Sequence, residues 1–303
     1  MIFDKLIGNY ILPAQHSIPK NIPLNIEEEG NSSFSNFMVS SVNGAELDTL
    51  IIRPNHLKKN SPYVVYLCGM RGSYTHKIKQ YQQRAEQYGH TAICFNYTNV
   101  GNSTGEVYNE KQLINDGKAQ VQRLLDLNIP ANKITLYGLS LGGAIATLIV
   151  SQFQKRGLRI RLINDRSFSK LSEALPQQLQ KVKPILSPLL KYFGWELNAA
   201  QAMQFINKED IFIITSKEDQ LIPYRNAALY QTMKPEMKKL YENVCYKKLT
   251  HSYKISNGIE LNEPRGNGCD PESKYGVHGA LLEKLIDKDK NRVIESVFKF
   301  VRS

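Results

Sequence analysis

The sequence predicts an α/β protein with a mostly parallel central sheet that is covered by helices on both faces. Strand-like and helix-like stretches alternate from about residue 35 to the end of the 303-residue chain, which is typical of such a sheet. Most of the strand-like stretches are continuous apolar runs, as expected for strands that are buried on both faces. Because 42% of the residues are hydrophobic, the chain can bury one large core or two modest ones. We expect one domain over residues 35–303, preceded by an N-terminal extension at 1–34.

The alternation opens with two β-rich runs on either side of Asn43-Gly44, within FMVSSVNGAELDTLIIRP. Both Asn and Gly tolerate a positive φ, so this dipeptide predicts a β-hairpin. Five short strands are expected to follow, at 63–67, 91–96, 134–137, 158–163 and 211–215. Apolar residues at helical spacing predict three helices, over 113–125, 143–153 and 293–301.

Two stretches interrupt the alternation. Residues 170–208 are rich in leucine but are broken by Pro176, Pro184 and Pro188, which predicts short, kinked helices in place of one long helix. Residues 252–277 are rich in Gly, Asn and Pro, which predicts a long loop.

The N-terminal sequence and the cysteines bear on the cellular compartment of the protein. No apolar run approaches the roughly 18 residues that a membrane-spanning helix needs, and Asp4 precedes only a short apolar stretch, unlike a secretory signal peptide. The four cysteines stand far apart, and Cys68 and Cys94 fall in expected core strands, so we expect buried free thiols in a reducing environment. The sequence therefore predicts a cytoplasmic protein and leaves export by a specialised route open.

The net charge of +11 permits an acidic partner such as an anionic membrane surface. The charge is not gathered in one block, because acidic residues dilute the lysines of the densest region, 234–254. No nucleic-acid module signature is present, so nucleic acid is not an expected partner.

A single hydroxyl framed by glycines lies in ITLYGLSLGG, residues 134–143. GLSLG matches the pattern G-x-S-x-G, and it follows an apolar strand and precedes a helix rich in small residues, as a nucleophile elbow requires. Bulky residues in place of the glycines would collide with neighbouring chain in so sharp a turn. The start of the helix adds N–H groups and a positive dipole end near a developing oxyanion. We therefore predict that Ser140 is a nucleophile; the alternative is a turn that serves packing only.

At this motif the chain resembles the α/β-hydrolase superfamily, over about residues 35–303. YLCGMRGS lies where the family has a strand followed by an H-G-x loop, with Cys68 in place of the histidine. FNYTNVGNSTG is similar to the family segment D-x-R-G-x-G-x-S-x-G, with Asn96 in place of the acid and Asn99 in place of the arginine. SKEDQLIP is similar to the acid-bearing loop that follows a late strand. NDRSFSKL and GLSLGGAIA together resemble poorly characterised α/β-hydrolase proteins of intracellular bacterial pathogens.

The resemblance implies the chain order nucleophile, acid, histidine. A serine hydroxyl becomes a good nucleophile when an imidazole takes its proton and a carboxylate orients that imidazole. Asp219 is the preferred acid because it follows the strand IFIIT and precedes a new helix. Asp165, at the end of the preceding strand, is the alternative; its other expected role is to pair with Arg166.

Two histidines follow the serine in the chain. His278, in YGVHGALLEKL, has the local sequence of the family's histidine loop and is favoured as the base. His251 follows a plausible last strand, VCYKKLT, and stays open as the alternative. The other four are expected on the surface or in loops: His16, His56, His76 and His90. By family position, the oxyanion hole consists of the backbone N–H groups of Met70 and Leu141.

These residues imply a serine hydrolase that cleaves a carboxylic ester or thioester through an acyl-enzyme intermediate. An acyltransferase, a peptidase and a non-catalytic binding protein with this fold are the alternatives. The expected substrate is a small-molecule or lipid-like acyl compound. No metal or cofactor is expected, because there is no H-E-x-x-H motif or His/Cys cluster, and GLSLGG lacks the ending of a phosphate-binding loop.

In this fold, an insertion after the strand that ends near Asp165 commonly lies over the nucleophile, so a small helical cap is expected at 170–208. Its leucines recur at helical spacing and are followed by three aromatic residues, Tyr192, Phe193 and Trp195. This apolar stripe is expected to line an acyl-chain pocket, to bury against the core, or to do both. In the first case, three lysines would face an anionic surface: Lys181, Lys183 and Lys191.

Overall fold

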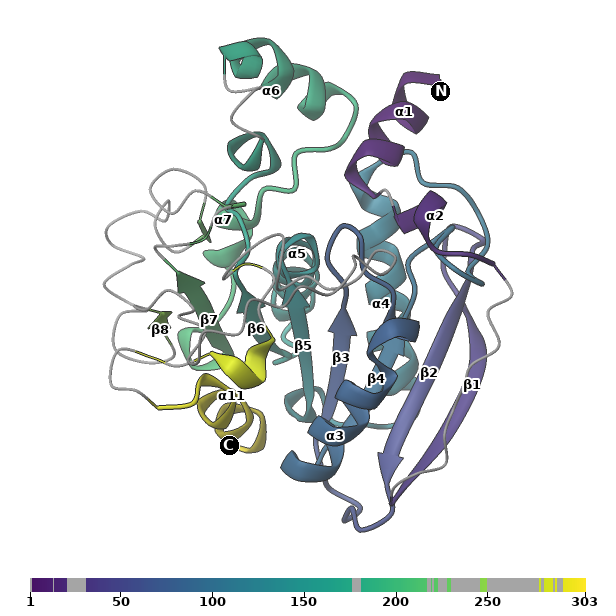
Figure 1. The fold of residues 1–303 in the computed structure, drawn as a ribbon, viewed down its shortest axis with the longest axis vertical. Coiled ribbons are helices and arrows are strands. Elements are labelled where there is room, and N and C mark those ends of the chain that lie inside the picture. Colours follow the sequence, from purple (N-terminus) through teal and green to yellow (C-terminus); the bar gives the residue numbers. More distant parts are fainter. Residues whose placement is uncertain are drawn as a thin grey trace, which may run out of the picture.

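An eight-stranded sheet crosses the protein in the order β1-β2-β4-β3-β5-β6-β7-β8 (Figure 1). The computed structural model describes residues 2–12, 14–20, 31–175, 181–216, 219, 221–222, 228–229, 246–249, 278, 281–285, 287 and 291–303. The strands are β1 Ser32–Ser40, β2 Glu46–Pro54, β3 Tyr63–Leu67, β4 Thr91–Phe95, β5 Ile134–Leu139, β6 Arg161–Asp165, β7 Ile211–Ser216 and β8 Tyr246–Leu249. The pairs β1–β2 and β2–β4 are antiparallel, and all other pairs are parallel. The predicted α/β class is therefore confirmed.

Helices cover both faces of the sheet. One face carries α3 Ile78–Tyr88 and α11 Val293–Arg302, and the other carries α4 Glu110–Asp126 and α5 Leu141–Gln154 (Figure 1). The described helices also include α1 Ile2–Ile11, α2 Ala14–Ser17, α6 Lys183–Tyr192 and α7 Ala199–Met203. None of the helices in the described ranges combines the length and the apolar composition needed to span a bilayer.

Local sequence explains where these elements begin and end. The hairpin β1–β2 turns over Val42-Asn43-Gly44, where Ser41 N–H donates to Ala45 O at 2.8 Å and Gly44 has a φ of 79°. A glycine at the left-handed position of a three-residue loop is the usual solution for such a hairpin. Helix α4 begins with a capping box between Asn109 and Gln112, so two otherwise unpaired N–H groups are satisfied at its first turn.

The segment predicted as an N-terminal extension packs on the rest of the protein. Ile11, Leu12 and Ile18 are buried in the same core as the helices α4 and α5. Strand β1 begins at Ser32, three residues before the predicted start of the domain. The division of the chain at residue 34 stays a prediction.

The described residues of 170–208, which are 170–175 and 181–208, form short elements, as predicted. They are the 3-10 turn Leu171–Ala174, then α6 with Pro188 inside it, and then α7. The apolar stripe of this segment is divided: Leu171, Leu175 and Trp195 are buried, whereas no residue of α6 is buried. Among the three aromatic residues, Trp195 belongs to the core and Tyr192 is 82% exposed.

The burial of the cysteine and histidine side chains agrees with the sequence at most positions. Cys68 and Cys94 are free and buried, as predicted. His16, His56 and His76 are exposed, and His90 lies in the loop between α3 and β4, as the prediction of a surface or loop position allows, but its side chain is not on the surface. The His90 ring is fully buried, stacks on Phe298 with ring centres 4.9 Å apart, and has its Nε2 3.0 Å from Tyr66 Oη. Its burial lowers its pKa to about 3, so it is a neutral core side chain.

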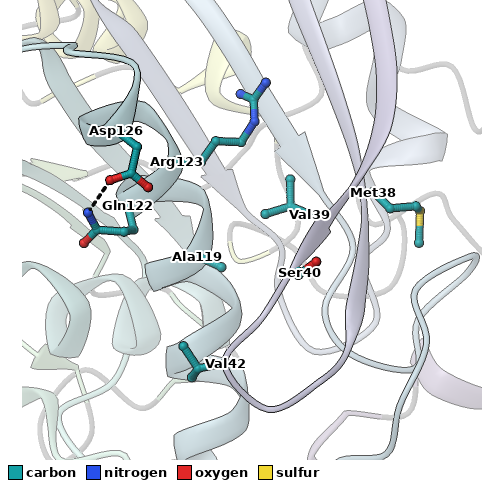
Figure 2. A pocket seen from close by; sticks show the side chains of 8 residues that line it. All are labelled: Met38, Val39, Ser40, Val42, Ala119, Gln122, Arg123 and Asp126. Atoms are coloured by element: carbon teal, nitrogen blue, oxygen red, sulfur yellow. Dashed lines mark hydrogen bonds between the residues drawn. The ribbon is translucent and has the colours of Figure 1, made fainter.

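A surface groove lies between β1 and α4 at the edge of the sheet (Figure 2). Its lining consists of Met38, Val39, Ser40, Val42, Ala119, Gln122, Arg123 and Asp126. None of the predicted site residues lines this groove, so the candidate site lies elsewhere.

Candidate active site

Ser140 lies on a strained turn between β5 and α5. Its φ of 55° and ψ of −119° are unusual for a residue with a side chain, and surrounding contacts must hold this conformation. The Ser140 N–H donates to Asp165 O at 2.9 Å, and its carbonyl accepts from Ser167 Oγ at 2.7 Å. The turn therefore presents the Ser140 hydroxyl at the carboxyl end of a central strand.

The glycines of the motif are required by close backbone contacts. A Cβ on Gly138 would lie 2.2 Å from Gly142 O, and a Cβ on Gly142 would lie 2.2 Å from Leu67 O. Neither distance is tolerable, and in both cases the obstacle is backbone that belongs to the elbow or to β3. The collisions that the sequence predicted for bulky residues are thus found at both positions.

His278 lies between Ser140 and Asp219. Its Nε2 is 3.0 Å from Ser140 Oγ, and its Nδ1 is 2.8 Å from Asp219 Oδ2. The His278 and Asp219 side chains are 7% and 3% exposed, so their contact is largely shielded from water. Asp219 Oδ1 accepts from the N–H groups of Leu221 and Ile222 at 2.9 and 2.8 Å, which fixes the carboxylate in its loop. In this arrangement Nδ1–H donates to the carboxylate, and Nε2 faces the serine as an acceptor.

Asp165, the alternative acid, is occupied by other partners. Arg166 donates to both of its oxygens, at 2.7 and 3.0 Å, and the Tyr137 hydroxyl donates to Oδ2. Burial alone would raise the pKa of Asp165, but the adjacent Arg166 guanidinium outweighs it and holds that pKa below its usual value. This is the ion pair expected as its structural role. The alternative base, His251, lies outside the described residues.

The two N–H groups expected to form the oxyanion hole border the elbow. Leu141 is the first residue of α5, so its N–H points out of the helix N-terminus. Met70 follows Gly69, where an added Cβ would lie 3.6 Å from Ser140 Cβ. Within the described ranges, neither N–H has a hydrogen-bond acceptor in the protein. Both N–H groups can thus donate to a partner from outside the protein.

The two asparagines that depart from the family pattern hold loops in place. Asn96 accepts from Ser73 Oγ at 2.8 Å and donates to the buried carboxylate of Asp48 at 3.2 Å. Asn99 has a φ of 63° and donates to Gln15 at 3.0 Å, which connects the N-terminal segment to this loop. Asn96 and Asn99 therefore have structural roles, because their hydrogen bonds hold these loops in place.

An ion pair missed from the sequence anchors the segment after His278 to α3. Arg84 Nε and Nη2 donate to the two oxygens of Glu283 at 2.6 and 2.9 Å, and Gln80 adds a third hydrogen bond at 3.1 Å. Arg84 is buried within the apolar face that Tyr81, Ala85 and Tyr88 give to α3. The position of Arg84 within this apolar stripe could have predicted an ion pair from the sequence, because a buried charged residue needs a partner. No cluster of three or more His, Cys, Asp or Glu side chains in the described part of the chain is suited to a metal ion.

Comparisons with known proteins bear on the family. The family described as "Chlamydia CHLPS protein (DUF818)" matches residues 66–235, a range that includes Ser140 and Asp219. An uncharacterized membrane protein of Saccharomyces cerevisiae, YNL320W, is 30% identical over 188 residues, which cover 59% of this chain and 62% of that protein. Protein bem46 of Schizosaccharomyces pombe is 21% identical over 235 residues, 77% of this chain and 75% of that protein. The chain thus spans less than two thirds of the budding-yeast relative.

Solved structures share the fold at low sequence identity. The alpha-beta hydrolase of Vibrio vulnificus has a TM-score of 0.60 at 16% identity, covering 83% of this chain and 86% of that one. The Pyrococcus furiosus esterase PF2001 has a TM-score of 0.58 at 19% identity, covering 78% and 89%. The predicted α/β-hydrolase fold is thereby confirmed.

Proposed function

The chain belongs to the Chlamydia CHLPS protein family (DUF818) and has the α/β-hydrolase fold, and from these premises we propose that it is a serine hydrolase. The proposed reaction is the cleavage of a carboxylic ester or thioester through an acyl-enzyme intermediate. The observation that carries the proposal is the continuous contact from Asp219 through His278 to Ser140, at 2.8 and 3.0 Å. It is also supported by the strained backbone of Ser140, since such strain clusters at active sites.

In the first step, Ser140 Oγ attacks the carbonyl carbon of the acyl group while His278 Nε2 takes the hydroxyl proton. Asp219 keeps the Nδ1 proton in place and stabilises the imidazolium that forms. The carbonyl oxygen becomes an oxyanion, which the N–H groups of Met70 and Leu141 stabilise. The bond to the leaving alcohol or thiol then breaks, and His278 returns the proton to that group.

In the second step, water replaces the leaving group. His278 takes a proton from the water as its oxygen attacks the acyl carbon, and a second tetrahedral intermediate forms. Its collapse breaks the bond to Ser140 Oγ, which recovers the proton from His278 and releases the carboxylic acid. An acyltransferase would differ only here, because an alcohol or amine would take the place of water. Esters are the first substrates to test, because esterases are among the solved structures that share this fold.

The test compares Ser140→Ala with Ser151→Ala; Ser151 lies in α5, the helix that follows Ser140, and its hydroxyl donates to Leu148 O at 2.9 Å. Both variants and the wild type are incubated with a fluorophosphonate probe, which labels only activated serines, and with short-chain acyl esters. We expect the Ser140 variant to lose labelling and to lose at least about 10³-fold in turnover, with the Ser151 variant unchanged. Labelling or near-normal turnover that survives in Ser140→Ala would refute the proposal. Product analysis with added alcohol separates hydrolysis from acyl transfer.

A further inference from the structure

Helix α6 exposes an apolar face to solvent. Val182, Ile185, Leu189 and Tyr192 recur at helical spacing and are 41%, 65%, 44% and 82% exposed. They lie on one side of a helix that projects from the body of the protein (Figure 1). Large apolar side chains grouped on a solvent-exposed face are typical of a docking site.

Contacts at the two ends of the helix fix its orientation. Leu190 and Phe193 pack partly against the main core, and the fully buried Trp195 follows, its N–H donating to Leu190 O at 2.7 Å. Lys183 at the start of the helix pairs with Glu173. The helix is therefore held at both ends, so the exposed face is a stable feature of the surface.

The charged residues of the helix itself have one sign. Residues 181–192 contain three lysines and no acidic residue. Lys181 and Lys191 are exposed at the two ends of the helix. The whole chain carries a net charge of +11, which adds to the attraction toward an anionic surface. This combination of an apolar strip flanked by lysines is the composition of a helix that lies in a membrane interface.

Helix α6 lies on the same side of the protein as Ser140. It lies beyond the carboxyl ends of the parallel strands, the same edge of the sheet at which Ser140 stands (Figure 1). A surface that binds α6 would therefore face this edge of the sheet.

We propose that α6 docks the protein on an anionic lipid bilayer. Ile185, Leu189 and Tyr192 enter the boundary between headgroups and acyl chains, while Lys181 and Lys191 contact lipid phosphates. A second copy of this chain is a poorer partner, because pairing two α6 faces would bring lysines of like charge together. The proposal is independent of the chemistry proposed for Ser140.

The experiment measures cosedimentation of the full chain with phosphatidylcholine vesicles, with and without 30 mol% phosphatidylserine (about one anionic lipid in three). The first variant, Ile185→Ser/Leu189→Ser, removes apolar area and is matched by Val42→Ser, a valine that is 86% exposed at the β1–β2 turn. The second, Lys181→Glu/Lys191→Glu, reverses charge and is matched by Lys58→Glu/Lys59→Glu, two exposed lysines elsewhere. Thermal unfolding confirms that each variant is folded.

We expect wild type, both control variants and Ser140→Ala to bind the anionic vesicles, and both α6 variants to bind at least about tenfold more weakly. Activity on a soluble short-chain ester should be equal in wild type and α6 variants, so failure of this proposal is distinguishable from failure of the proposed hydrolase. Equal binding by all variants, or equal binding to neutral vesicles, would overturn the inference. So would sedimentation showing that the α6 variants dissociate an oligomer, because the face would then be an interface between copies.

Discussion

Replacing Glu283 with alanine is expected to destabilise the protein more than replacing its partner Arg84 with methionine. The Arg84 side chain is 5% exposed and that of Glu283 is 31% exposed. Glu283→Ala leaves a buried guanidinium without its carboxylate, a change that costs about 3–5 kcal/mol of unfolding free energy. Arg84→Met keeps the apolar stem and leaves a carboxylate that water and Gln80 can solvate, for a cost of about 1–2 kcal/mol.

The assay is urea unfolding of both single variants and of Arg84→Met/Glu283→Leu. The double variant should be more stable than Glu283→Ala, because it removes both charges together. Since Glu283 follows His278 closely in the chain, Glu283→Ala should also lower kcat on a soluble ester while KM changes little. A Glu283→Ala variant that is as stable as Arg84→Met would refute the reasoning from burial.

The same ion pair has a pH dependence of known sign. Burial alone would raise the pKa of Glu283, but its hydrogen bonds to Arg84 outweigh this and hold the pKa below the ordinary value of 4.5. A carboxyl group whose pKa is lowered by folding contributes stability above its unfolded pKa, and this contribution is lost as the pH falls through the folded value. The stability difference between wild type and Glu283→Ala should therefore shrink below about pH 4.

Two further predictions concern buried side chains away from the elbow. Burial raises the pKa of Asp116 from 3.8 to about 7, against the opposing hydrogen bonds from Thr98, so stability should fall as the pH rises from about 4 to 7, by up to about 4 kcal/mol. Asp116→Asn should flatten this dependence in urea titrations at several pH values; an unchanged slope would show that the carboxyl is not the source. Trp195→Ala should lose about 3–5 kcal/mol of unfolding free energy, because the ring is fully buried. Tyr192→Ala, three positions earlier and 82% exposed, should lose less than about 0.5 kcal/mol, and equal losses would contradict the assignment of Trp195 to the core.

The sequence by itself determined the features that depend on a few neighbouring residues. Gly138, Ser140 and Gly142 predicted the elbow because the collisions that exclude larger residues occur within one turn and the adjoining strand. Continuous apolar runs predicted the strands, and the prolines predicted the broken helices of 170–208, because each effect acts on the local backbone. The roles of Ser140, Asp219 and His278 stay predictions, although the three side chains come together as expected.

The tertiary structure decided what depends on contacts between distant residues. A regular spacing of leucines says that a helix has apolar sides, but which side is covered depends on the path of the chain, so Trp195 is buried while Ile185 is exposed. The burial of His90 within its loop could not be predicted, because its partners, Tyr66 and Phe298, come from other elements. Arg84 and Glu283 are 199 positions apart, and no local pattern encodes their pairing. Burial and ion pairing depend on residues that are distant in the sequence, so only the tertiary structure shows them.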